Sequence, residues 1–99
     1  MINNYLLRNR DTAHRIIDGV AIIVNPETGK MYTLNEVGTY IWEHADGRHT
    51  ISDIIDGVCE MYEVDKSKAV DDVNLFINDL TEKNVVVLVE KELSRNSER

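Results

Sequence analysis

The dipeptide Asp18-Gly19 constrains this chain most, because it separates two short runs rich in Ile and Val, residues 14–17 and 20–24. β-Branched residues favour strands, where their side chains pack on a pleated surface. Asp and Gly tolerate the positive φ angles that a two-residue type I′ turn requires. The sequence therefore predicts a β-hairpin with its turn at Asp18-Gly19.

A second turn follows at residues 25–29. Pro26 has the fixed φ that suits the start of a turn, and Gly29 can adopt the left-handed conformation that closes a hairpin. This turn predicts a third strand over residues 30–34. Whether residues 5–7 add an earlier strand is left open, since the polar segment after them has little periodicity.

After the third strand the spacing of apolar residues changes from two to about 3.6, which indicates helices. Each apolar stripe is preceded by a residue that can cap a helix, and Thr50 with Asp53 resembles a capping box. The expected helices run from Asn35 to Asp46-Gly47, from about 51 to 63, and from Asp65 to about Lys83.

Five consecutive apolar residues, 85–89, predict a terminal strand, and Asn84 can end the preceding helix in a left-handed conformation. The 99 residues fit one domain, which we place at 1–90, followed by a charged, flexible tail at 91–99. The expected fold class is α+β. A three-stranded antiparallel sheet precedes a three-helix bundle in a winged-helix-like arrangement, and one edge of the sheet stays open.

The charge of the chain argues against nucleic acid as a partner. Eleven Lys and Arg against 18 Asp and Glu give a formal net charge of −7, which repels phosphate. The second expected helix has four acidic residues and no Lys or Arg, so a winged-helix DNA-binding regulator is the weaker alternative. No apolar run approaches the ~20 residues that span a bilayer. We therefore expect a cytoplasmic protein that binds no membrane.

No motif in the sequence carries catalysis. The three histidines and the single Cys59 lack the spacing of a metal site, and no nucleophile elbow or glycine-rich phosphate loop occurs. The prediction is a protein that is not an enzyme and has no catalytic residue, cofactor or metal. The single Trp42 is either a core anchor or a peptide contact.

Three segments of the chain, residues 24–42, 46–55 and 62–86, share the order and spacing of motifs of a known family. Together they resemble the PqqD-like family, the pyrroloquinoline quinone biosynthesis protein D family and its relatives in peptide-modification pathways. Residues 24–42 are similar to its pattern of strand, Thr-Gly, strand and L-N-x-x-G-x-x-I-W. Residues 46–55 resemble its D-G-x-x-T-x-x-x-I segment, and residues 62–86 resemble its C-terminal end. The resemblance spans roughly residues 13–88. The turn at residues 25–29 resembles the lasso-peptide and general subgroup of the family more than the quinone-cofactor proteins.

This resemblance implies a precursor-peptide recognition element for ribosomally made, post-translationally modified peptides. Such a domain binds the leader of the precursor as an added strand between the third strand and the third helix. It then presents the peptide to a modifying enzyme, a radical S-adenosylmethionine protein or a leader protease. Carried onto this chain, the expected peptide-binding residues are Lys30, Met31, Tyr32, Thr33, Leu34, Val70, Asn74 and Ile77. We assign Val73, Phe76 and Leu80 to the core.

Other readings of the sequence remain open. The chain could be a regulatory or structural partner subunit of an enzyme without contacting a leader peptide. An open sheet edge could also pair with a second copy, which would give a homodimer.

Overall fold

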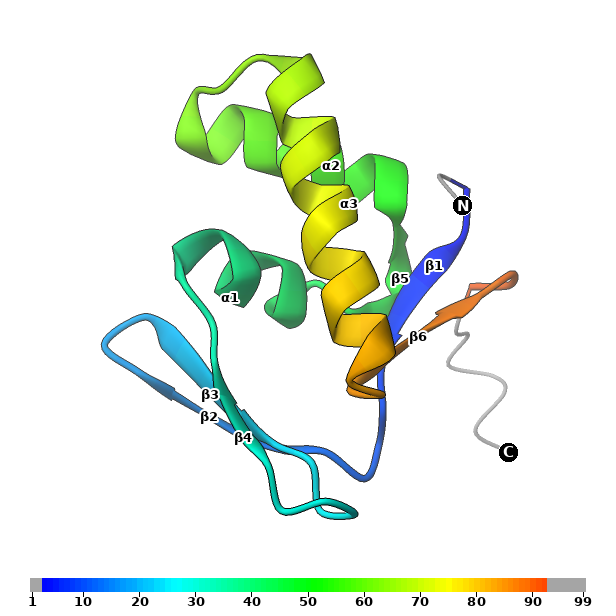
Figure 1. Cartoon of the computed structure of the whole chain (residues 1–99). Helices are drawn as coiled ribbons and strands as arrows, with labels where there is room; N and C mark the ends of the chain where they lie inside the picture. Colours follow the sequence, from blue (N-terminus) through cyan, green and yellow to red (C-terminus); the bar gives the residue numbers. More distant parts are fainter. Residues whose placement is uncertain (1–2, 93–99) are drawn as a thin grey trace.

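The computed structural model describes residues 3–92, which form two three-stranded antiparallel sheets and three helices (Figure 1). One sheet has the strand order β2-β3-β4 and the other β5-β1-β6. The α+β class is confirmed, and the second sheet is an addition to the single sheet that the sequence predicted. The strands are β1 (Tyr5–Arg8), β2 (Ala13–Ile17), β3 (Val20–Val24), β4 (Met31–Thr33), β5 (Asp46–Thr50) and β6 (Val86–Val89).

The predicted hairpin is confirmed. Strands β2 and β3 pair from Ala13 opposite Val24 to Ile17 opposite Val20. Asp18 and Gly19 between them have φ of 52° and 78°, the two positive values of a type I′ turn. Strand β4 pairs with the other side of β3, as predicted, and is shorter than the expected 30–34.

Each of the three helices begins at the cap that the sequence indicated. They are α1 (Glu36–Glu43), α2 (Ile51–Tyr62) and α3 (Lys66–Glu82). The Asn35 side chain accepts the Gly38 N–H at 2.9 Å. Thr50 and Asp53 form a complete capping box, and Asp65 accepts the Lys68 N–H at 3.0 Å. Helix starts could therefore be read from side-chain chemistry alone.

The segment after α1 was predicted wrongly. Asp46-Gly47 was expected to end the helix in a loop, but these residues begin β5, which leads directly into α2. Strand β5 pairs with β1, and β1 pairs with β6 on its other side. The uncertain segment at residues 5–7 is thus the central strand of the second sheet. Its partners come from the middle and the end of the sequence, so no local pattern reveals the pairing.

The chain leaves α3 through Asn84, whose φ of 59° is left-handed, as predicted. Asn84 adopts the left-handed conformation that Gly often adopts after the end of a helix. The terminal strand β6 then pairs with β1. Of the expected tail, residues 93–99 lie outside the described part of the chain.

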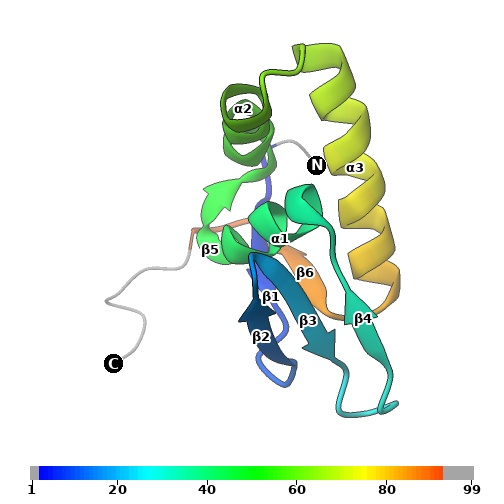
Figure 2. The same ribbon diagram turned by 90° about the vertical axis from the view of Figure 1, so that its left-hand side faces the viewer.

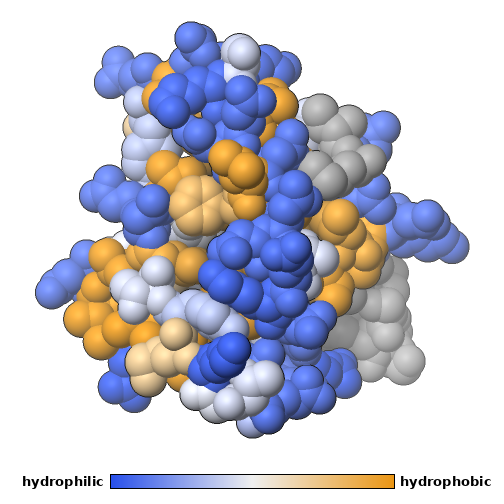
Figure 3. Space-filling model, viewed as in Figure 1, coloured by the Kyte–Doolittle hydropathy of each residue, from blue (hydrophilic) through white to orange (hydrophobic). Residues whose placement is uncertain are grey.

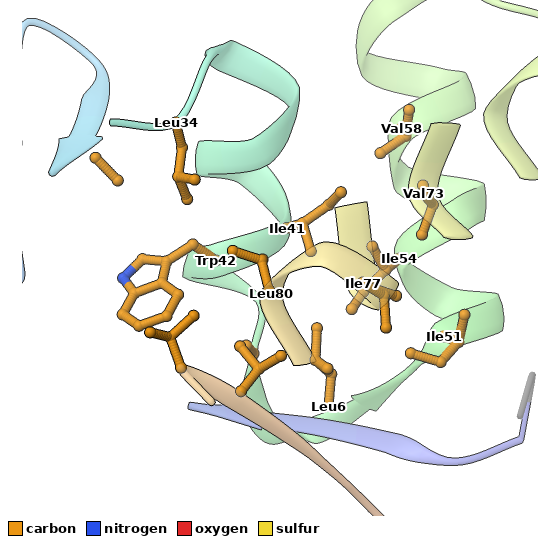
Figure 4. Close-up of a cluster of buried hydrophobic side chains, with 14 of the residues drawn as sticks. Leu6, Leu34, Ile41, Trp42, Ile51, Ile54, Val58, Val73, Ile77 and Leu80 are labelled. Atoms are coloured by element: carbon orange, nitrogen blue, oxygen red, sulfur yellow. The ribbon is translucent and has the colours of Figure 1, made fainter. Parts of the chain in front are cut away.

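The core lies between the helices and both sheets, with Ala21 and Ile23 from β3 and Leu6 and Val86 from the second sheet (Figure 4). Trp42 is fully buried there, which confirms the core-anchor reading and removes it as a peptide contact. Helix α3 contributes Ala69, Val73, Ile77 and Leu80, the stripe that packs against α2 and β6. No helix among residues 3–92 has the length and apolar content needed to cross a membrane.

Candidate functional site

Strand β4 is an exposed edge of its sheet. It pairs with β3 on one side, and the order β2-β3-β4 gives it no strand on the other. Helix α3 lies on the side of this open edge (Figures 1 and 2). Met31 at the start of β4 is 66% exposed, the second highest value among the large apolar side chains described. Unpaired edge strands are templates for pairing with another chain.

The hydrogen bonds of β4 show which of its backbone groups are free. The carbonyl oxygen of Lys30 accepts from Asn25 at 2.9 Å, and the N–H of Leu34 donates to Ala21 at 2.9 Å. Because successive residues of a strand point their backbone groups to opposite edges, Tyr32 also faces β3. The N–H and C=O groups of Met31 and Thr33 therefore point to the open edge, where an added strand would pair.

Helix α3 forms the opposite wall with a flank that is distinct from its buried stripe. A hollow of about 210 Å³ is lined by Asp72, Leu75, Phe76 and Asp79. A second hollow of about 420 Å³ lies toward the end of the helix, where Asp79 and Lys83 face Tyr32 of β4. Asp79 lines both hollows, so they are adjacent along α3, and β4 reaches the second of them through Tyr32. We refer to the two hollows together as the cleft. In Figure 3, apolar surface beside α3 is surrounded by hydrophilic surface.

Polar contacts join the two walls of the cleft at one end. The Asn25 side chain donates to the carbonyl oxygen of Lys83 at 3.1 Å, which joins the β3–β4 turn to the end of α3. The Lys83 ammonium lies 4.6 Å from the centre of the Tyr32 ring and 2.7 Å from Asp79 Oδ2. These contacts set the distance between β4 and α3 at that end.

The floor of the other end depends on Gly38 of α1. A Cβ atom built on Gly38 would lie 2.8 Å from Cε1 of Phe76 and 3.2 Å from Cβ of Leu34. Real Cβ atoms essentially never come within 3.0 Å of another residue's heavy atoms, so only Gly lets the Phe76 ring come this close to α1. Gly38 thus holds an apolar ring at the base of the cleft.

Two of the four carboxylates that line the cleft are paired within α3, whereas Glu27 and Glu82 form no ion pair with Lys or Arg among residues 3–92. Asp72 lies 3.1 Å from the Lys68 ammonium, and Asp79 pairs with Lys83. The side chains of both pairs are at least about a third exposed, so each pair contributes little to stability. The cleft thus offers a partner exposed apolar side chains and the free backbone groups of β4.

The structure places the sequence-predicted site residues in two groups. Lys30 and Tyr32 line the cleft, Met31 and Thr33 form the exposed edge, and Leu34 is buried at 5% exposure. The helix positions are different. Ile77 is fully buried in the core, so its expected place in the groove is wrong.

Val70 and Asn74 line neither hollow. Like Ile77, they follow the helical spacing of the flank that turns away from β4. The prediction put Ile77 in the groove and Phe76 in the core, whereas the structure has these two neighbours the other way round. The error is a shift of one position on the helix. Phe76, which we assigned to the core, is only partly buried and lines the cleft.

Sequence reasoning missed six residues of the α3 wall: Asp72, Leu75, Phe76, Asp79, Glu82 and Lys83. One signal could have found them. Leu75 is out of phase with the buried stripe, and it is 69% exposed on an otherwise polar face. Its out-of-phase position assigns Leu75 to the surface, and beside the partly buried Phe76 it forms the apolar part of the hollow.

The described residues 3–92 contain no group of three or more His, Cys, Asp and Glu that could hold a metal ion. Of the three histidines, His44 and His49 lie next to each other, with ring centres 5.1 Å apart. Cys59 is partly exposed.

The fold and the cleft define a class of small α+β domain with an open strand edge beside a helix. Comparison with protein families gives the particular family. Residues 21–86 match the family described as Coenzyme PQQ synthesis protein D (PqqD), which is two thirds of the chain, and the protein belongs to this family. The resemblance noted from the sequence motifs is thereby confirmed.

Two solved structures share the fold. The first, "TbiB1 in Complex with the TbiA(beta) Leader Peptide", has a TM-score of 0.75 at 24% identity over 81% of this chain and 93% of that chain. The second, "Lasso peptide synthetase B1 complexed with the leader peptide", has a TM-score of 0.72 at 18% identity over 83% of this chain and 96% of that chain. Among curated proteins, none matches this sequence.

Proposed function

We propose that this protein binds the leader segment of a ribosomally made precursor peptide as an added strand on β4. The observation that carries this proposal is the cleft itself. Its one wall has free backbone N–H and C=O groups at Met31 and Thr33, and its other wall has exposed apolar side chains on α3. Strand addition uses these two elements together, the backbone for affinity and the side-chain pockets for specificity.

Both structural neighbours are complexes with leader peptides, which supports a peptide as the occupant of the same fold. Leu75 and Phe76 suit an apolar leader side chain, since they line the hollow nearest the middle of α3. The outward backbone of β4 suits any extended sequence. Affinity would thus depend more on one or two apolar side chains of the leader than on the rest of its sequence.

The role that follows is non-catalytic. The protein would present the leader to a modifying enzyme, a radical S-adenosylmethionine protein or a leader protease, in the cytoplasm where the precursor is made. Holding the precursor near the enzyme raises its effective concentration there without any new chemistry. An enzyme subunit that never contacts a leader is the alternative, and direct binding of the leader distinguishes the two.

The test is a titration of the protein with leader peptides encoded by small open reading frames adjacent to its gene. Leu75→Ser should lower the affinity for the leader roughly ten- to a hundredfold, because burying a leucine side chain contributes about 1.5–3 kcal/mol to binding. The matched control is Met61→Ser, which removes a side chain of similar exposure, 61% against 69%, on α2. Met61 lines neither hollow of the cleft.

The control variant should bind the leader as the unmodified protein does. Equal affinities for the two variants would show that α3 does not contact the peptide. If no neighbouring leader binds at all, the recognition role is wrong and the partner-subunit reading takes its place.

A further inference from the structure

A third hollow, with a different chemistry, lies on the other side of α1 from the cleft. It measures about 320 Å³ and is lined by side chains that include Glu36, Tyr40, Glu43, Met61 and Tyr62. Glu36, Tyr40 and Glu43 recur at i, i+4 and i+7, so they form one stripe of α1. This stripe lies about half a turn around the helix from Gly38, which faces Phe76 of α3. Figure 2 shows α1 with β5 on one side and α3 on the other.

The aromatic rings of this hollow are held in fixed positions. Tyr40 and Tyr62 meet edge to face, with ring centres 6.3 Å apart and planes at 84°. The Tyr62 hydroxyl donates to the carbonyl oxygen of Glu36 at 3.2 Å. The ring of His44 stacks on Tyr40 at 4.1 Å, and its Nδ1 donates to the Tyr40 carbonyl oxygen at 2.8 Å. The Tyr40 hydroxyl also packs against Gly57, where a Cβ atom would collide with it.

The hollow is negatively charged and its carboxylates lack a cation. Within residues 3–92, the ion pairs involve other acidic groups, so Glu36, Glu43 and Glu60 form none with Lys or Arg. Burial raises the pKa of Tyr40, and the carboxylate of Glu60 raises it further. Burial also raises the pKa of Tyr62, together with the charges of Glu36 and Glu43. In the cleft beside α3, Asp72 and Asp79 have lysine partners, whereas Glu27 and Glu82 form no ion pair with Lys or Arg within residues 3–92.

We propose that this hollow, which we call the acidic aromatic pocket, docks an arginine side chain of the modifying enzyme. A guanidinium group pairs with carboxylates and stacks on aromatic rings, and the pocket offers both. The exposed Met61 beside it adds apolar contact for the rest of the docking segment. The inference rests on the proposed function, because it assigns the enzyme to one side of α1 and the leader to the other. Both partners could then be bound at once.

The first experiment uses a chemical probe, the peptide acetyl-Gly-Arg-Gly-Arg-Gly-amide, in an NMR titration at low salt. We expect shifts at the amides of Tyr40 and Tyr62, and none when citrulline, a neutral isostere, replaces arginine. The double variant Glu36→Gln/Glu43→Gln should weaken the probe about tenfold. Asp71→Asn/Glu90→Gln is the matched control, because both of its sites are exposed and it changes the net charge equally. Equal weakening by the two double variants, or shifts that follow α3 instead, would overturn the proposal.

The second experiment measures the affinity of the same variants for the modifying enzyme encoded beside the protein's gene. Glu36→Gln/Glu43→Gln should weaken the enzyme complex about tenfold and leave leader affinity within about twofold, since the leader cleft lies on the other side of α1. An unchanged enzyme affinity, or no enzyme binding by the unmodified protein, contradicts the docking proposal while normal leader binding keeps the proposed function. If the unmodified protein binds no leader, the result contradicts the proposed function instead.

Discussion

At the scale of single residues, Gly38 connects helix packing to the cleft. Its missing side chain gives space to the Phe76 ring, which lines the hollow on α3. Glycine inside a helix costs about 1 kcal/mol relative to alanine. The close approach of α1 and Phe76 offsets this cost, since the ring packs where a Cβ atom would stand.

We predict that Gly38→Ala destabilises the protein by about 1 kcal/mol and weakens leader binding. Displacing a packed ring costs about 1–3 kcal/mol, which exceeds the gain in helix propensity. Urea denaturation measures the free energy of unfolding, and a leader titration measures the affinity. In a Phe76→Leu background the cost should shrink, because the two residues are in contact. An alanine that stabilises the protein and leaves binding intact would contradict the role of Gly38.

At the scale of elements, the local parts of the fold could be predicted and the long-range parts could not. The Asp18-Gly19 turn and the caps at Asn35, Thr50 and Asp65 depend on neighbouring residues, and the structure has all of them. Strand β5 was missed because its residues, including Gly47 and Arg48, have no strand pattern of their own. It is a strand only because β1 lies beside it.

The candidate site divides in the same way. Strand β4 could be predicted as an edge, because its hairpin is local. The facing flank of α3 depends on how the helix is rotated against the core, and a stripe of apolar residues defines that rotation only to about one position. Ile77 and Phe76 were exchanged for this reason, although both are apolar and adjacent.

The backbone of β4 allows a sharp test at the element scale. Thr33→Pro removes an N–H that points to the open edge and keeps the bonds to β3, so the free protein should stay folded. Leader affinity should fall roughly tenfold or more, because the complex loses a backbone hydrogen bond and leaves its partner unpaired. Thr33→Ala is the control and should bind normally. A circular dichroism melt of each variant checks the fold, and equal leader affinities would argue against pairing at this edge.

At the scale of the whole molecule, α1 separates two surfaces of different chemistry. The cleft beside α3 has exposed apolar side chains and a free strand edge, which fits an extended peptide. The acidic aromatic pocket on the other side has unpaired carboxylates, which fits a cationic partner. Self-association through β4 would compete with the leader, so binding measurements belong at protein concentrations where the chain is monomeric.

The measurement that tests strand addition most directly is amide hydrogen exchange along β4, with and without a leader peptide that binds. In the free protein, the amides of Tyr32 and Leu34 should be protected by β3, whereas those of Met31 and Thr33 should exchange freely. A bound leader should protect Met31 and Thr33 and complete the alternation. If the leader binds and these two amides still exchange as fast as before, it does not add a strand to β4.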